Sequence, residues 1–395
     1  MQVHTVKRGE SIFGIAREHA ISPRGIIEVN GLENPDVLAV GQELLILRPS
    51  RSYTAAAGDT VGAVARRFGI RREDIFAANP QLLCDERLYE GQLIALGYGD
   101  ARLGMAASNG YLYRGYSEEA LRRALPYLTY LTVAAAIAEG GEITSLFDGR
   151  AAVRIANENG KIPILRVYVK DGSGISGDEA RGSFISRLIA FATEGGYRGI
   201  CLSMPEQGEG ARAYEEFIIS LRKQMIGSGL ILFTEAVCGR ECGYADYADG
   251  CVLSYDKPLL SGVTDFEHGE RRAFTEYAEA SESTKTFMDI TSFAVSDGDF
   301  LTYGDAVKTA AKVGADISHD VGRGICSYSY HGKDGRAIEV RYESLKNIIA
   351  KLELLGELGY MGISFDINRT PVAHLMAYSA LFSGICYTSV FSSGL

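Results

Sequence analysis

The chain of 395 residues is too long for one small domain, and its 46% hydrophobic and 23% charged residues are typical of a soluble globular protein. Its formal net charge of −10 argues against a nucleic-acid-binding surface, which needs clustered Lys and Arg. No apolar run reaches the roughly 18–20 residues that span a bilayer, and the N-terminus lacks the apolar segment of a secretory signal peptide, so we expect cytosolic synthesis.

Seven cysteines are scattered along the chain, which fits reduced thiols better than a disulfide framework. Cys238 and Cys242 are close enough to begin a metal site, but the sequence does not point to the further ligands that such a site needs. We therefore predict no metal and no cofactor.

An internal repeat fills the first hundred residues. HTVKRGESIFGIAREHAISPRGIIEVNGL at 4–32 aligns with YTAAAGDTVGAVARRFGIRREDIFAANPQL at 53–82. Each unit contains a short strand, a Gly-acid-hydroxyl turn whose hydroxyl caps the following helix, a second helix, and a Gly-Gln turn into a closing strand. The repeat predicts two βααβ modules.

Both units resemble LysM modules, which share a Y-T-V-x-x-G-D-T-L opening, a central Asn-Pro or Asn-Gly, and a closing G-Q-x-L. The resemblance implies LysM modules at 1–48 and 52–97 that bind glycans containing N-acetylglucosamine, such as peptidoglycan and chitin. The sugar would lie in a groove between the loop after the first strand and the loop before the second. These positions also form turns and caps, but the doubled module favours glycan binding, since two weak sites gain avidity on a repeating polymer. The implied groove residues are Gly9, Glu10, Ser11, Ile12, Asn30, Gly31 and Leu32 in the first module, and Gly58, Asp59, Thr60, Val61, Asn79, Pro80 and Gln81 in the second.

After the repeats, short apolar runs alternate with amphipathic stretches. Eight such runs predict an α/β fold, a (β/α)8 TIM barrel at 100–395. Between the seventh and eighth runs, a hairpin with its turn at 333–335 indicates a small α+β insertion at about 300–343. The runs expected as strands are 102–107, 127–136, 162–169, 199–204, 230–236, 251–255, 286–290 and 362–367.

Two such modules, this barrel pattern and this insertion together resemble the bacterial spore-associated family 18 glycoside hydrolases, which have chitinase-like barrels. The resemblance is clearest in LTYLTVAAAIAEGGEIT, VLSYDKP and GYMGISFDI. It implies a fourth strand of the form G-[FY]-D-G-x-D/N-x-D-x-E, whose Glu protonates the glycosidic oxygen while the acetamido group of the substrate attacks the anomeric carbon. The strand period of two places these carboxylates on one face, where their pKa values couple.

The fourth strand, in GYRGICLSMPEQG at 196–208, departs from that motif. Glu206 is acidic but one residue late, so in an unbroken strand it would face away from the barrel interior. The preceding proline could mark a bulge that turns Glu206 back toward the site. The degenerate motif positions, in order, are Arg198, Cys201, Ser203 and Pro205.

Other parts of the family's pocket are partly present. Tyr255 and Asp256 match the Tyr-Asp that ends the sixth strand, although both also fit a plain strand end and turn. Asp366 occupies the place of the tryptophan on which a sugar usually stacks, and the chain has no tryptophan. Four tyrosines could substitute with a smaller apolar face, namely Tyr111, Tyr113, Tyr168 and Tyr328.

Three functions follow from these patterns. In the first, the LysM modules hold the protein on peptidoglycan of the spore cortex or cell wall, and the barrel is a pseudoenzyme that binds a modified glycan or a partner such as a spore-coat protein. In the second, the barrel is an active cortex-lytic N-acetylglucosaminidase that uses Glu206, Glu235 or Asp289. The third is chemistry at Cys201, beside which the sequence shows no activating base. The resemblance also implies synthesis in a mother cell and deposition at the spore surface.

Overall fold

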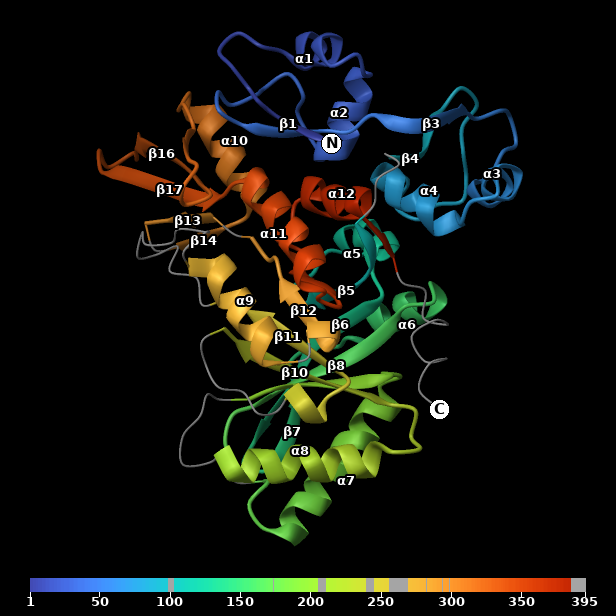
Figure 1. Ribbon diagram of the computed structural model, residues 1–395, viewed down its shortest axis with the longest axis vertical. Coiled ribbons are helices and arrows are strands. Elements are labelled where there is room, and N and C mark those ends of the chain that lie inside the picture. Colours follow the sequence, from blue (N-terminus) through green and yellow to red (C-terminus); the bar gives the residue numbers. More distant parts are fainter. Residues whose placement is uncertain are drawn as a thin grey trace.

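The computed structural model describes residues 1–98, 103–172, 174–204, 211–238, 245–255, 269–281, 283–292, 294–297 and 299–384. The two repeat modules and the insertion lie together at one end of the molecule, and the barrel forms the rest (Figure 1). No helix in the described part of the chain is long and apolar enough to cross a membrane.

The first module has the expected βααβ order, and its two strands pair antiparallel. The hydroxyls of Ser11 and Ser22 cap the two helices by accepting hydrogen bonds from Gly14 N and Gly25 N. The apolar stripes of both helices are buried against the strands, which gives the module a core of its own. Its elements are β1 (Gln2–Thr5), α1 (Ile12–Glu18), α2 (Pro23–Asn30) and β2 (Glu43–Ile46).

The second module repeats this arrangement around a separate core. Thr60 caps its first helix, and Gly69 ends that helix with a φ of +66°, a left-handed conformation that glycine adopts without strain. A short 3-10 helix follows its second helix. Its elements are β3 (Pro49–Thr54), α3 (Val61–Phe68), α4 (Arg72–Ala78), η1 (Pro80–Leu82) and β4 (Leu93–Tyr98).

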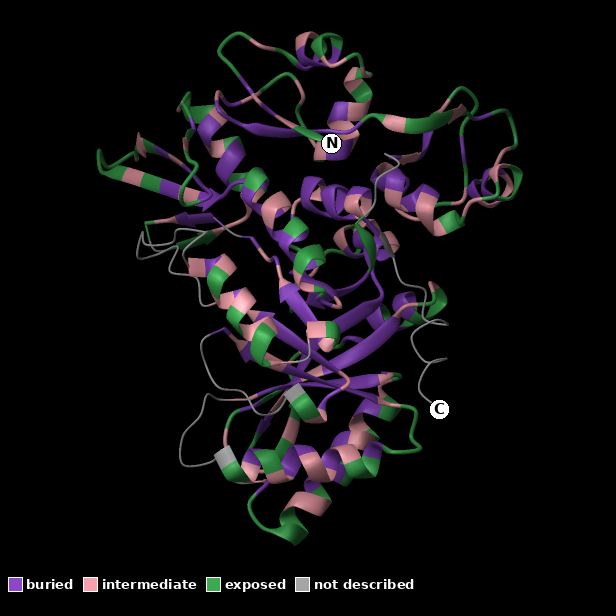
Figure 2. Ribbon diagram, viewed as in Figure 1, coloured by how far each residue is buried: buried purple, intermediate pink, exposed green. Residues whose placement is uncertain are grey.

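Eight parallel strands close into a barrel, because the eighth strand pairs with the first and the first with the second. Figure 2 shows these strands as a buried centre, with exposed residues on the outer faces of the helices. The fold class is therefore confirmed. In sheet order the strands are β5 (Gly104–Leu112), β6 (Tyr130–Glu139), β8 (Ile162–Val169), β9 (Gly199–Ser203), β10 (Ile231–Val237), β11 (Gly250–Ser254), β12 (Thr286–Asp289) and β18 (Gly362–Asp366).

Helices cover the outside of the barrel, and two further strands extend its sheet. The added strands are β7 (Glu142–Ser145), antiparallel to β6, and β19 (Phe382–Gly384), parallel to the start of β5. The helices are α5 (Glu118–Ala124), α6 (Arg150–Glu158), α7 (Asp178–Glu194), α8 (Ala211–Met225), α9 (Arg271–Ala280), α11 (Leu345–Leu358) and α12 (Val372–Leu381).

The first two barrel strands lie further along the chain than expected. The run 102–107 was expected as a strand, whereas β5 continues through Ser108 and Asn109 to Leu112. Both residues are fully buried, Asn109 on the inner face of the barrel and Ser108 on the outer face, and Asn109 Oδ1 accepts a hydrogen bond of 2.7 Å from Thr132 Oγ1. A buried polar residue that has a hydrogen-bond partner can continue a strand. The apolar run at 102–107 therefore underestimated the length of β5.

The insertion between the seventh and eighth strands is a five-stranded antiparallel sheet with one helix. Its hairpin turns where expected, since Gly335 N donates to Gly332 O at 3.0 Å. Thr302 caps the helix by accepting a hydrogen bond from Asp305 N. The elements are β13 (Ala294–Ser296), β14 (Asp299–Leu301), α10 (Tyr303–Val313), β15 (Ser318–Asp320), β16 (Ile325–His331) and β17 (Ala337–Glu343).

The first module packs directly against the insertion. Ile317 N donates to Val40 O at 2.8 Å. A Cβ at Gly41 would lie 2.1 Å from the carbonyl oxygen of Ile317, so this approach requires glycine. The buried carboxylate of Glu43 accepts a hydrogen bond of 2.6 Å from the backbone N–H of Leu345, at the start of α11. The module is thereby joined both to the insertion and to the barrel.

Candidate functional sites

A charged network occupies the barrel interior near the C-terminal ends of the strands, where TIM barrels hold their active sites. Glu235 of β10 and Arg166 of β8 face each other across β9 and form two hydrogen bonds, Nε to Oε1 at 2.6 Å and Nη2 to Oε2 at 2.9 Å. Arg166 Nη2 also donates to Ser203 Oγ of β9 at 2.8 Å. The hydroxyl of Tyr111, from β5, donates to Glu235 Oε1 at 2.8 Å. Four strands therefore contribute to one network.

This network determines the charge of the acid. Burial raises the pKa of Glu235, but the charge of Arg166 and the hydrogen bonds from Arg166, Ser203 and Tyr111 outweigh burial, so the pKa lies below its usual value. A general acid must carry a proton near neutral pH, which requires a raised pKa. Glu235 is therefore held in the ionised form, unsuited to protonating a leaving group.

Cys201 and Ser203, two of the degenerate motif positions, both lie in the barrel interior beside this pair. The Sγ atom of Cys201 is 3.7 Å from the hydroxyl oxygen of Tyr111 and 3.9 Å from Glu235 Oε1. Burial and the neighbouring Glu235 carboxylate raise the pKa of the Cys201 thiol well above its usual value. This environment keeps the thiol protonated and disfavours it as a nucleophile.

Two further predicted residues that the structure describes, Arg198 and Tyr255, lie away from this network. Arg198 precedes β9, and its backbone N–H donates to Pro163 O at 2.8 Å, near the N-terminal ends of the strands. Tyr255 packs against Phe274 of α9, with ring centroids 6.5 Å apart. Three predicted site residues, including the proposed general acid, lie outside the described residues: Pro205, Glu206 and Asp256.

Two aspartates at the strand ends close the turns that follow them. Asp366, the last residue of β18, accepts hydrogen bonds from Asn368 N at 2.9 Å and Arg369 N at 3.3 Å. Burial raises the pKa of Asp366, and those two hydrogen bonds and the charge of Arg369 offset this only in part. Asp289 accepts bonds from the N–H and the hydroxyl of Thr291 at 2.9 and 2.6 Å. Both carboxylates thus stabilise the turns that follow their strands, and the pKa of Asp366 remains above its usual value.

Two of the four candidate sugar-stacking tyrosines present a face to solvent. Tyr113 and Tyr168 are 39% and 38% exposed. Tyr111 is 6% exposed and stacks on Tyr113 at a centroid distance of 6.0 Å. Tyr328 is buried in the insertion, where its hydroxyl donates to Ala306 O at 2.7 Å, so it cannot stack on a sugar.

In the LysM modules, the loop after the first strand is exposed at its glycine and hydroxyl residues, but its acid is used internally. Glu10 Oε2 accepts a hydrogen bond from Lys7 N at 2.8 Å and lies 2.8 Å from His4 Nε2. Asp59 repeats this role, with the hydroxyl of Tyr53 donating to it at 2.6 Å. The acids shape the loops, so a sugar there would meet mainly backbone atoms and the exposed hydroxyls.

The central asparagine of each module connects a helix to the closing strand. Asn30 Nδ2 donates to Ile26 O and Leu45 O, each at 2.9 Å, and its Oδ1 accepts from Leu45 N at 2.7 Å. Asn79 makes the equivalent bonds to the backbone of Ala95. The amides are therefore occupied within the modules. The predicted groove residues Ile12 and Val61, along with Pro80, are buried.

An exposed aromatic beside the first groove was not singled out from the sequence. Phe13 follows the Gly9–Ile12 loop and is 72% exposed. The signal was present, because Ile12, Ile15 and Ala16 form the buried stripe of α1 and Phe13 falls outside it. An aromatic face at the edge of a groove can stack on a sugar ring.

Two groups of side chains have metal-ligating types close together among the described residues. In one, His4 Nδ1 and His19 Nε2 are 3.1 Å apart. In the other, His319 Nε2 donates to Gly41 O at 2.7 Å and its Nδ1 lies 3.5 Å from Cys326 Sγ. Direct contacts therefore join two side chains in each group. Burial raises the pKa of the Cys238 thiol to about 12, and Cys242 lies outside the described residues.

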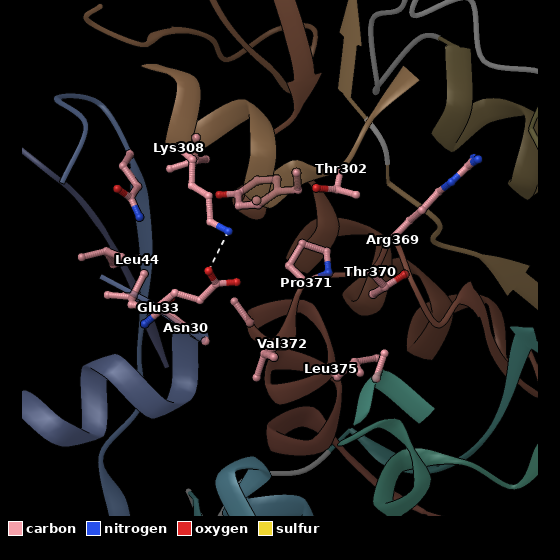
Figure 3. Close-up of a pocket in the computed structure, with 18 of the residues that line it drawn as sticks. Asn30, Glu33, Leu44, Thr302, Lys308, Arg369, Thr370, Pro371, Val372 and Leu375 are labelled. Carbon is pink, nitrogen blue, oxygen red and sulfur yellow. Dashed lines mark hydrogen bonds and ion pairs between the residues drawn. The ribbon is translucent and has the colours of Figure 1, made fainter. Parts of the chain in front are cut away.

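A pocket of about 690 Å³ lies between the first LysM module, α10 and the start of α12. Asn30, Gly31 and Leu32 of the predicted groove form one wall. Figure 3 shows Glu33 and Lys308 meeting across the pocket, with Pro371 and Val372 opposite them. The predicted groove residues Asn30, Gly31 and Leu32 therefore border a cavity that the barrel and the insertion complete.

Comparison with known proteins agrees with this architecture. The LysM domain family matches residues 4–47 and 53–96. YdhD of Bacillus subtilis, a candidate sporulation-specific glycosylase, is 22% identical over 398 aligned positions that cover 90% of this chain and 93% of YdhD.

Solved structures share the fold across the whole chain. The spore cortex-lytic enzyme SleL of Bacillus megaterium QM B1551 superposes with a TM-score of 0.76 at 21% identity, covering 98% of this chain and 99% of SleL. A chitinase of Chromobacterium violaceum superposes with a TM-score of 0.61 at 20% identity, covering 70% of this chain and 98% of the chitinase. The chain thus consists of two LysM domains followed by a barrel with the chitinase-like fold that these structures share.

Proposed function

We propose that this protein binds peptidoglycan through its LysM domains, in the spore cortex or cell wall, and that its barrel is a pseudoenzyme. The ion pair of Arg166 with Glu235 carries this proposal. The pair gives the barrel interior an ionised glutamate joined to an arginine, whereas glycoside hydrolysis needs a protonated acid.

The binding half of the proposal rests on the LysM domains. Both have exposed loops at the predicted groove, and two domains on one chain can engage one glycan strand together. The spore location is supported by the names of the relatives, since SleL is a spore cortex-lytic enzyme and YdhD a candidate sporulation-specific glycosylase.

The pseudoenzyme half rests on the chemistry of the fourth strand and its neighbours. Substrate-assisted hydrolysis needs one carboxylic acid for the leaving group and a second group that orients the acetamide. Cys201 and Ser203 supply neither, and Glu235 is ionised and fully engaged. The remaining candidate acid on the fourth-strand segment is Glu206.

An active N-acetylglucosaminidase that uses Glu206 is the second candidate. The observation in its favour is the likeness to SleL, named as a lytic enzyme, across nearly the whole chain. The two candidates differ in one measurable step, which is cleavage of a glycosidic bond.

The test is the release of reducing ends and muropeptides from purified cortex fragments by the wild type and by Glu206→Gln, with Glu209→Gln as a control for a nearby acid. We expect no release above buffer from any of the three. Release by the wild type and by E209Q but not by E206Q would show that the barrel is an enzyme and would overturn the pseudoenzyme half.

Binding is tested separately by sedimentation of the full chain with insoluble peptidoglycan. We expect the protein to be depleted from the supernatant and to be recovered there when soluble glycan fragments compete. A protein that stays in the supernatant without competitor would contradict the binding half of the proposal.

A further inference from the structure

We propose that the pocket between the first LysM domain, α10 and α12 is a subsite for an anionic sugar, namely the carboxylate-bearing muramyl residue of a peptidoglycan strand. This inference rests on the proposed glycan binding and specifies which sugar is read and where. A glycan in the first LysM groove would then be bound by three parts of the fold together.

The position of the pocket connects it to the groove. Asn30, Gly31 and Leu32, predicted to contact glycan, line it. A Cβ added to Gly31 would lie 3.0 Å from Val372 Cγ2, so this loop lies close against the first residue of α12. A sugar chain that follows the groove past Gly31 enters the pocket. Its volume of about 690 Å³ lies within the range of roughly 300–1,000 Å³ that is common for ligand sites.

The charge of the pocket is opposite to that of the protein. Four cationic side chains and two carboxylates line it in a chain of net charge −10. Arg123 pairs with Glu119, and Arg369 lies 3.5 Å from Asp366, so the cations left to a ligand are Lys308 and Lys312. A positive cavity on an acidic protein favours an anionic ligand and disfavours a neutral one. The cations are Arg123, Lys308, Lys312 and Arg369, and the carboxylates are Glu33 and Glu43.

The two carboxylates, Glu33 and Glu43, differ in how far they neutralise the positive charge of the pocket. Glu43 is buried and directed to Leu345 N, to which its Oε2 lies at 2.6 Å. Glu33 pairs with Lys308 across the pocket at 2.8 Å, and both side chains are mostly exposed (Figure 3). An exposed pair of this kind exchanges partners at little cost, so Lys308 can turn to a ligand. Lys312, one turn further along α10, is exposed and has no ion pair with a described carboxylate.

A second group of donors lies at the start of α12. Thr370 is 8% exposed, and its hydroxyl has no hydrogen-bond partner among the described residues. The helix begins after Pro371 with no side-chain cap. His374 N donates to Pro371 O at 3.1 Å, so the N–H groups of Val372 and Ala373 keep their donor capacity at the positive end of the helix dipole. A buried hydroxyl without a partner is unfavourable, and an oxygen-rich ligand would relieve this.

Muramic acid has the anionic group that this pocket suits. It differs from N-acetylglucosamine by a lactyl ether that ends in a carboxyl group, which is a carboxylate where no stem peptide is attached. A peptide-free muramyl strand and a chitin strand therefore share their sugar backbone and differ in charge. The structure therefore predicts that the protein prefers the muramyl strand to chitin.

Two matched tetrasaccharides test this preference by calorimetric titration of the full chain. One alternates N-acetylglucosamine with N-acetylmuramic acid and carries no peptide, and the other is chitotetraose. We expect the muramyl ligand to bind about three- to tenfold more tightly at low salt, with a difference that shrinks as salt screens the charges.

Substitutions then distinguish an effect of the pocket's charge on binding from an effect of the contact between the domains. Lys308→Gln and Glu33→Gln break the same ion pair but change the charge of the pocket in opposite directions. We expect K308Q and Lys312→Gln each to weaken muramyl binding about threefold, E33Q to strengthen it by a similar factor, and chitotetraose binding to stay unchanged in all three. Lys333→Gln, at the exposed hairpin turn of the insertion, is the matched control and should behave as the wild type.

The outcomes are distinct. Equal affinity of the wild type for the two tetrasaccharides overturns the inference and leaves the proposed glycan binding in place. Equal weakening by K308Q and E33Q also overturns it, because the pair would then act only by holding the domains together. Failure of the wild type to bind either tetrasaccharide overturns the inference and the proposed binding together.

Discussion

Glu235 and Arg166 are joined by two hydrogen bonds, of 2.6 and 2.9 Å, between strands that lie on either side of β9. Each side chain is about a fifth exposed, and each is the only charged residue inside its strand. The positive charge of Arg166 therefore compensates the negative charge of Glu235, which would otherwise lie unpaired between the strands. It also explains why the barrel interior tolerates a glutamate without a raised pKa.

Replacing Glu235 by Gln should destabilise the protein, because it leaves the Arg166 guanidinium in the barrel without a counter-charge. Breaking a buried pair costs about 3–5 kcal/mol, and partial exposure lowers the expected loss to about 2–4 kcal/mol. Urea unfolding followed by circular dichroism measures it. Asp148→Asn, which breaks an exposed pair with Arg150, should leave the urea midpoint unchanged, and equal behaviour of the two variants would contradict the role of the pair.

The stability that E235Q loses should depend on pH in a defined direction. The pKa of Glu235 is lower in the folded state than its usual 4.5, so its stabilising effect is complete above that value and is lost as the pH falls through the folded pKa. The difference in unfolding free energy between wild type and E235Q should thus be largest at neutral pH and shrink below about pH 4.5. A difference that stays constant down to pH 3 would show that the ionised carboxylate is not its source.

Asp366 should show the opposite trend. Burial raises its pKa above the usual 3.8, so the ionised form destabilises the fold at neutral pH, and this penalty is relieved as the pH falls through the raised value. Asp366→Asn keeps an oxygen for Asn368 N and Arg369 N. We expect D366N to be more stable than the wild type at pH 7 and equal to it near pH 3, as measured by thermal unfolding at each pH. A variant less stable at pH 7 would contradict the raised pKa.

Lys351 makes a further buried charge network. It is 0% exposed on α11, and its Nζ lies 2.7 Å from Glu270 Oε1 and also pairs with Glu343 at the end of β17. Lys351→Met would leave two carboxylates close together without a cation, at a cost of about 3–5 kcal/mol in unfolding free energy. Chemical denaturation measures the loss, and Lys333→Met at the exposed hairpin is the control.

The Lys351 network offers a rescue test. The triple variant K351M/E270Q/E343Q removes all three charges and should recover much of the stability lost in K351M, because only unpaired buried charge is costly. If the triple variant is as unstable as K351M, packing of the lysine stem, and not its charge, explains the loss.

Phe13→Ala should weaken peptidoglycan binding without changing stability, because the ring is 72% exposed beside the predicted groove. Loss of one aromatic face is expected to weaken binding about three- to tenfold. Sedimentation with insoluble peptidoglycan measures it. Phe300→Ala, which removes a 54% exposed ring from the insertion, is the matched control, and equal binding by F13A and F300A would place the sugar elsewhere.

The LysM domains were largely predictable, because their signals are local. The hydroxyls of Ser11 and Thr60 cap the next helices, as their spacing indicates. Gly69 ends α3 in a conformation that suits glycine. The sequence did not indicate that Asn30 and Asn79 use their amides inside the modules, since their partners lie 15 and 16 residues further along the chain.

The barrel class was also predictable, from eight apolar runs separated by amphipathic stretches. The limits of the strands were less predictable, because Ser108 and Asn109 continue β5 with buried polar side chains that bond to Thr129 N and Thr132 Oγ1, respectively. Burial of a polar residue depends on a partner in another strand, and that partner is unknown until the sheet is closed.

The sequence alone determined the repeat, the alternation of strands and helices, and the absence of Asp and Glu from 198 to 205, since each depends on residues close together in the chain. Only the tertiary structure decided which charged side chains meet inside the barrel. Arg166 and Glu235 are 69 residues apart and meet because a closed barrel places β8 and β10 on either side of β9. Glu33 and Lys308 are 275 residues apart and meet because the insertion packs on the first LysM domain. Such distant residues come into contact only because the tertiary packing places their strands and helices next to each other.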